Sequence, residues 1–133
     1  MNTNAMNTYD IDAAKRHFAA KLAYTTGSHE LAHMIDSQAD VVIVDVRLPK
    51  DYRAGHIPGA INLPNGRWQK PEGLRKDTRN ILYCYSQTCH LAAEAAAELL
   101  ALGYPVVEME GGFAAWQADG AQSETDAASK AAA

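Results

Sequence analysis

Residues 41–46 read Val-Val-Ile-Val-Asp-Val, an almost unbroken run of β-branched residues. A strand that is apolar on both faces is typical of a parallel sheet covered by helices on both sides. Two shorter runs of this kind occupy residues 81–83 and 105–109. Between them, residues 90–102 are rich in Ala and Leu and predict a helix that ends at Gly103. Strand, helix and strand in this order predict an α/β domain with a mainly parallel sheet.

Length and composition predict one domain with polar ends. A chain of 133 residues that is 47% hydrophobic and 21% charged is ordinary for a single globular domain with a buried core. Residues 1–9 are polar and residues 119–133 are small and polar, so we predict a flexible N-terminal tail and a disordered C-terminal tail. The domain itself is predicted to span residues 10–118, and Asp10 can cap its first helix, which runs to about Ala20.

The charge and the apolar pattern argue against nucleic acid and against a membrane as partners. Twelve Lys and Arg against sixteen Asp and Glu give a formal net charge of −4, which disfavours binding to a phosphate backbone. No apolar run reaches the ~18 residues of a membrane span. The first residues lack the basic and apolar regions of a secretory signal, so we expect reduced thiols in the cytoplasm.

The two cysteines, Cys84 and Cys89, stand between a predicted strand and a predicted helix. Functional sites of open α/β sheets lie in this position, beyond the carboxyl ends of the strands. Unpaired backbone N–H groups at the start of the helix would lower the pKa of Cys84, which makes it a candidate nucleophile. The alternative is a small buried residue without a catalytic role. Cys89 is either a resolving thiol that attacks sulfur bound to Cys84 or an inert packing residue.

Several short motifs stand in an order that resembles single-domain rhodaneses. The resemblance covers about residues 27–117 and implies a rhodanese-like α/β fold, with a central, mainly parallel five-stranded sheet flanked by helices on both faces. The motifs are Asp45-Val46-Arg47, Asp51-Tyr52, Gly55-His56-Ile57-Pro58-Gly59-Ala60-Ile61-Asn62, Tyr83-Cys84, Gly103-Tyr104-Pro105-Val106 and Gly111-Gly112-Phe113-Ala114-Ala115-Trp116.

The resemblance implies sulfur transfer without a metal or an organic cofactor. Cys84 would take a sulfane sulfur from a small-molecule donor, carry it as a persulfide, and pass it to a thiol or cyanide acceptor, with a partner protein as a further possible donor. Backbone N–H groups of the following loop would stabilise the persulfide anion. The loop residues are Tyr85, Ser86, Gln87, Thr88, Cys89 and His90.

Three charged residues outside the loop are candidates for a supporting role. Asp45 and Arg47 lie two apart on a predicted strand, so their side chains share one face. They could place an anionic donor or, as the simpler interpretation, tie neighbouring loops together. Arg67 lies in a long irregular stretch, residues 64–80, and could attract an anion if that stretch borders the site.

The loop departs from the family pattern in charge and in length. Many rhodanese loops carry Arg or Lys, whereas this one is uncharged up to His90, so thiosulfate is expected to be a poor donor and a persulfide or polysulfide a better one. The loop is also about two residues longer than the usual rhodanese loop. Longer loops occur in dual-specificity phosphatases and arsenate reductases, which are a minor alternative, but His90 stands where those enzymes need an arginine. A thiol redox or sulfur-sensing module using Cys84 and Cys89, and a docking module without catalysis, are further alternatives.

Overall fold

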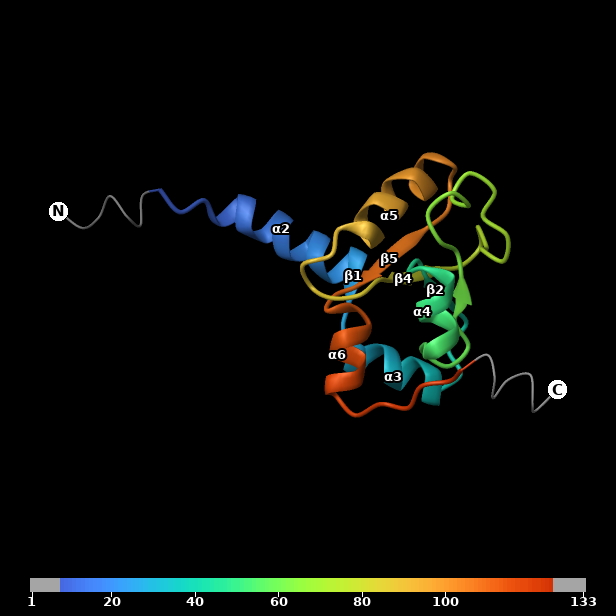
Figure 1. The fold of residues 1–133 in the computed structure, drawn as a ribbon. Coiled ribbons are helices and arrows are strands. Elements are labelled where there is room, and N and C mark those ends of the chain that lie inside the picture. Colours follow the sequence, from blue (N-terminus) through green and yellow to red (C-terminus); the bar gives the residue numbers. More distant parts are fainter. Residues whose placement is uncertain (1–7, 126–133) are drawn as a thin grey trace.

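The computed structural model describes residues 8–125, so the predicted tails are described only in part. Figure 1 shows helices on both sides of a central sheet, with helix α2 extending away from the rest of the domain. The helices are α2 (Ile11–Tyr24), α3 (Ser28–Asp36), α4 (Pro49–Ala54), α5 (Leu91–Ala101) and α6 (Gly112–Ala118). The strands are β1 (Thr25–Thr26), β2 (Val42–Asp45), β3 (Ile61–Asn62), β4 (Asn80–Tyr83) and β5 (Val106–Met109).

The five strands form one parallel sheet in the order β1-β5-β4-β2-β3. This arrangement confirms the predicted fold class. Strand β4 lies at the centre, between β5 and β2, and every residue of β4 is buried. Because it is the central strand, the loop that follows it is surrounded by the loops of both neighbours.

Alternation along the strands divides the core into two layers. Ile43, Ile81 and Tyr83 face α3 and α6, where Phe113 and Trp116 pack against them. The opposite layer contains residues of β2, β4 and β5 together with one face of α5 and the stretch after β3. Its fully or nearly buried members include Val44, Leu82, Cys84, Ala95 and Leu99. The cysteine therefore lies on the side of the sheet that α5 covers, as Figure 1 shows for that helix.

Helix α2 begins as predicted and continues beyond the expected end. The carboxylate of Asp10 accepts a hydrogen bond from the N–H of Ala13 at 2.9 Å, and the helix runs to Tyr24. None of its residues is buried, and the side chains of Phe18 and Leu22 are 55% and 83% exposed. In the described part of the chain no helix has the length and apolar character needed to cross a membrane.

Residues 119–125 belong to the segment that the sequence predicts as a disordered C-terminal tail, and in the structure they make hydrogen bonds to the domain. The indole N–H of Trp116 donates to the carbonyl of Gln122 at 2.8 Å, and His56 and Glu124 exchange two backbone hydrogen bonds of 2.9 Å. A composition poor in apolar residues did not reveal these contacts, because they are hydrogen bonds and most of the groups of residues 119–125 that form them belong to the backbone. Residues 126–133, like residues 1–7, lie outside the described part of the chain.

Candidate active site

Cys84 directly follows strand β4 and lines a pocket of about 140 Å³. The pocket lies between the loop that leads to α5 and the turn that joins β5 to α6. The first loop contributes Ser86, Gln87, Cys89 and His90. The structure thus brings both cysteines into one cavity at the carboxyl edge of the sheet.

Helix α6 holds the backbone of the cysteine loop in place. The N–H of Phe113 donates to the carbonyl of Cys84 at 2.8 Å, and the N–H of Ala114 donates to the carbonyl of Tyr85 at 3.0 Å. Gly112 has φ +62°, and a Cβ at this position would lie only 2.6 Å from the backbone nitrogen of Ser86. Only glycine allows this approach, so the Gly111-Gly112 motif shapes the site.

The sulfur of Cys84 is in an environment that favours the thiol. The residue is 3% exposed, and its Sγ lies 3.6 Å from the carbonyl oxygen of Cys89. Burial raises the pKa of Cys84 to about 11, and a hydrogen bond with the Cys89 side chain adds to this. Backbone N–H groups of Ala92 and Ser86 partly offset the increase. The prediction of a lowered pKa for Cys84 is therefore wrong, because burial outweighs the backbone donors.

Cys89 is the more acidic partner of the pair. Its own burial raises its pKa. The interaction with Cys84 and the backbone N–H groups of Leu91 and Tyr85 lower the pKa by more than burial raises it, so the net pKa is below the usual value of a thiol. When one of the two thiols loses its proton, the thiolate is therefore favoured on Cys89 rather than on Cys84.

This distribution of charge predicts which thiol is alkylated first. In the absence of a sulfur donor, iodoacetamide at pH 7 should modify Cys89 faster than Cys84, because the thiolate is the reactive form and Cys89 is also the more exposed residue. Peptide fragmentation after a time course of labelling measures the two rates. Faster labelling of Cys84 would contradict the assignment of the thiolate to Cys89.

Two residues of the predicted loop do not line the pocket. The hydroxyl of Tyr85 donates to the carboxylate of Asp51 at 2.5 Å and accepts from the N–H of Leu48 at 3.2 Å, so its side chain is directed towards the start of α4. The hydroxyl of Thr88 lies 3.3 Å from the hydroxyl of Ser86, and Thr88 likewise does not line the Cys84 pocket. The predicted set of residues 85–90 thus reduces to four pocket residues.

Asp45 and Arg47 form a buried ion pair behind the loop rather than a donor-binding pair. Arg47 Nη2 lies 2.8 Å from Asp45 Oδ2 and donates to the carbonyl of Gly55 at 2.6 Å. Its guanidinium lies 4.2 Å from the ring centroid of Phe113, and the hydroxyl of Tyr83 donates to Asp45 at 2.8 Å. Neither side chain lines the Cys84 pocket. The pair joins the ends of β2 and β4 to the turn after α4, which agrees with the simpler interpretation.

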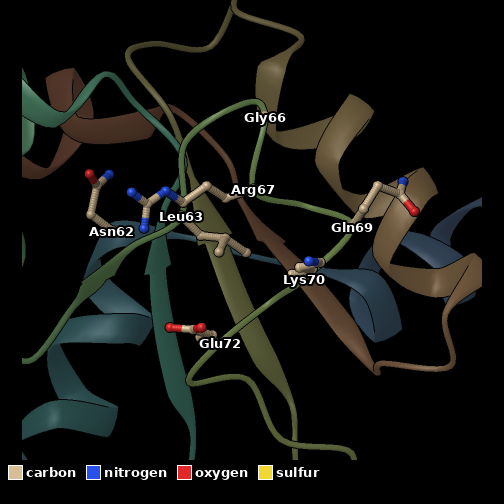
Figure 2. A pocket seen from close by; sticks show the side chains of 7 residues that line it. All are labelled: Asn62, Leu63, Gly66, Arg67, Gln69, Lys70 and Glu72. Atoms are coloured by element: carbon tan, nitrogen blue, oxygen red, sulfur yellow. The ribbon is translucent and has the colours of Figure 1, made fainter.

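Arg67 lies in a different cavity, of about 530 Å³, beside the end of β3. Figure 2 shows Arg67, Asn62 and Lys70 around this cavity, which does not include either cysteine. The irregular stretch is anchored there by Trp68, which is 3% exposed and donates its indole N–H to the carbonyl of Leu63 at 2.9 Å. A supporting role for Arg67 at Cys84 is therefore not supported.

The end of β5 contributes pocket residues that the sequence analysis missed. Glu108, Glu110, Gly111 and Gly112 all line the Cys84 pocket. The predicted parallel sheet could have revealed these residues. In a parallel sheet the carboxyl ends of neighbouring strands lie at the same edge, so the end of β5 must lie beside Cys84. No Lys or Arg is among the described lining residues, so nothing supports a phosphatase, which would need an arginine.

A parallel sheet of this order, with a cysteine at the end of its central strand, defines an α/β domain of the rhodanese type. Residues 28–119 match the rhodanese-like domain family, and the chain belongs to that family. The chain is similar to thiosulfate sulfurtransferase GlpE of Pseudoalteromonas translucida, with 40% identity over 81 residues that cover 59% of this chain and 75% of that protein. The family to which this chain belongs therefore includes sulfurtransferases.

Similarity extends to a solved structure and to a larger protein. The structure of BH2092 from Bacillus halodurans has a TM-score of 0.81 and 32% identity, and the match covers 87% of both chains. The HTH-type transcriptional regulator Rv0324 of Mycobacterium tuberculosis is 34% identical over 82 residues, which cover 61% of this chain and only 36% of that protein. The rhodanese-like domain thus also occurs as one part of longer proteins.

Proposed function

We propose that this protein is a sulfurtransferase that carries sulfane sulfur as a persulfide on Cys84. The observation that carries the proposal is the position of Cys84, which directly follows the central strand β4 and lines the pocket, where the backbone N–H groups of Ser86 and Ala92 favour the thiolate. These donors stabilise negative charge on sulfur in the persulfide and in the attacking thiolate. Membership of a family that includes sulfurtransferases supports the proposal.

The reaction proceeds in two sulfur transfers. The Cys84 thiolate attacks the outer sulfur of the donor, the S–S bond of the donor breaks, and the leaving group departs with the electron pair, which gives Cys84–S–S⁻. An acceptor thiolate or cyanide then attacks the terminal sulfur and releases the Cys84 thiolate. The thiolate of Cys89, which lines the same pocket, takes the proton of Cys84 as the first S–S bond forms.

The proposed donor is a small molecule or a partner protein that bears a persulfide or polysulfide, and the acceptor is a thiol or cyanide. Both cysteines are free thiols, as this chemistry requires. Such thiols persist in a reducing compartment, so we place the protein in the cytoplasm as part of the same proposal.

Intact-mass measurement tests the proposal. After incubation with glutathione persulfide or methanethiosulfonate, the protein is expected to gain the mass of one sulfur atom, and peptide fragmentation between the two cysteines should place that sulfur on Cys84. Cyanide should remove it and release an equal amount of thiocyanate. A protein that gains no sulfur from any of these donors, or gains it only on Cys89, would contradict the proposal.

A dithiol switch is the second candidate, because Cys84 and Cys89 are both free thiols and line the same pocket. Peroxide would take two electrons from the pair, which would lose two protons and form a Cys84–Cys89 disulfide while the peroxide becomes water. Loss of two hydrogen atoms under mild peroxide, without uptake of sulfur from any donor, would favour this candidate. Sulfur uptake that cyanide reverses would favour the sulfurtransferase.

A further inference from the structure

Two acidic residues share the face of the sheet that carries Cys84. In the parallel pair β4 and β5, Leu82 stands opposite Glu108. Side chains two residues apart along a strand point to the same side. Cys84 follows Leu82 by two residues and Glu110 follows Glu108 by two, so both lie on the same face of the sheet as that pair. Accordingly, Glu108 and Glu110 both line the pocket that contains Cys84.

The charge of this pocket is negative. Lys21 of α2 pairs with Glu110 at 2.9 Å and offsets that carboxylate. Within residues 8–125 no ion pair forms with Glu108, which is half-buried beside the first turn of α5. No described lining residue is Lys or Arg, and His90 is the remaining basic group.

Glu108 itself responds to this negative environment. Burial raises its pKa, the neighbouring charge of Glu110 raises it further, and His90 lowers it in part. The same negative potential acts on any anion that enters the pocket, and added salt weakens it in part, because the site is only half-buried.

We propose that Glu108 sets the charge selectivity of the Cys84 pocket, so that a dianionic sulfur donor such as thiosulfate is disfavoured relative to a donor with less negative charge. This inference rests on the proposed sulfur transfer and names the donor class that it uses. Like charges brought close together in a partly buried site repel each other strongly. Glu108 is thus a specificity-determining residue that acts on the donor before the S–S bond breaks.

Two donors that differ in charge provide the test. Thiosulfate carries two negative charges, whereas the methanethiosulfonate anion carries one, and both present a sulfane sulfur bonded to an oxidised sulfur. With cyanide as the acceptor in both assays, wild-type protein should show a higher kcat/KM for methanethiosulfonate. Glu108→Gln should raise kcat/KM for thiosulfate about tenfold at low salt and change the value for methanethiosulfonate much less.

A matched charge change and a salt series separate a local effect from a general one. Glu72 is exposed in the cavity of Figure 2, so Glu72→Gln alters the net charge equally and should leave the ratio of the two kcat/KM values unchanged. Added salt should raise the relative activity of wild-type protein with thiosulfate, which tests the proposal without any substitution.

A ratio that Glu108→Gln leaves unchanged, or that Glu72→Gln changes equally, would overturn the selectivity proposal while sulfur transfer stands. Failure of both donors to load Cys84 would overturn both proposals.

Discussion

Replacing Cys84 with serine is expected to abolish sulfur transfer and to lower kcat/KM at least about a thousandfold. A serine hydroxyl barely ionises near neutral pH and forms no persulfide, so neither the attack on the donor nor the carrier state remains. Production of thiocyanate from methanethiosulfonate and cyanide measures the loss, and intact mass should show no sulfur gained at residue 84. Retention of a tenth of the wild-type activity would contradict the assignment of Cys84 as the sulfur carrier.

The fold should survive this substitution. Serine is close to cysteine in size, and the carbonyl of Cys89, which lies 3.6 Å from the Cys84 sulfur, is available as an acceptor for the new hydroxyl. We expect a loss of about 1 kcal/mol in the free energy of unfolding. Thermal unfolding followed by circular dichroism verifies that the inactive variant is folded.

Cys89→Ser is the matched control for the loss of a thiol from the same pocket. It should still load sulfur on Cys84, several-fold more slowly, because the group that accepts the Cys84 proton is gone. A dithiol switch would behave differently, since either substitution removes the disulfide completely. The two variants together therefore distinguish the sulfur carrier from the redox pair.

Replacing Asp45 with alanine is expected to destabilise the domain by about 3–5 kcal/mol, a large part of the ~5–15 kcal/mol that stabilises a typical domain. Burial opposes the charge on Arg47, but the hydrogen bond and the charge of Asp45 outweigh it and raise the pKa of Arg47. Without Asp45, this guanidinium remains charged and 4% exposed with no carboxylate beside it. Urea denaturation measures the change from the shift in the midpoint.

The exposed pair Arg75–Asp77 is a matched control, because its residues are also two apart and 2.9 Å from each other. Asp77→Ala should change the free energy of unfolding little, since water and salt screen an exposed pair. The double variant Asp45→Ala/Arg47→Met should recover part of the stability lost in Asp45→Ala, because it removes the unpaired charge. A small loss for Asp45→Ala, equal to that for Asp77→Ala, would contradict the structural role of the buried pair.

The sequence predicted the parts of the fold that depend on local patterns. The β-branched run of residues 41–46 and the apolar run before Cys84 indicated buried parallel strands, and the Ala-rich segment before Gly103 indicated the helix α5. These patterns also placed Cys84 at the edge of the sheet where sites occur. The family resemblance added the five strands and the expected chemistry.

The features that the sequence missed depend on contacts between distant residues. The raised pKa of Cys84 comes from burial beneath α5 and from Cys89, and no local pattern gives the balance between burial and backbone donors. Glu108 enters the pocket only because β5 pairs with β4 in one particular register. The segment 119–125 is held by backbone hydrogen bonds to His56, for which side-chain composition gives no signal.

The close contact between Gly112 and the cysteine loop links local motion at the site to unfolding of the domain. Helix α6 buries Phe113 and Trp116 in the core, and the N–H of Phe113 also holds the carbonyl of Cys84. The loop cannot release that hydrogen bond unless α6 shifts, and α6 cannot shift without exposing both rings. We therefore expect the cysteine loop to open only together with α6, so that the backbone amides of Phe113 and Ala114 should be among the slowest of the domain in hydrogen exchange.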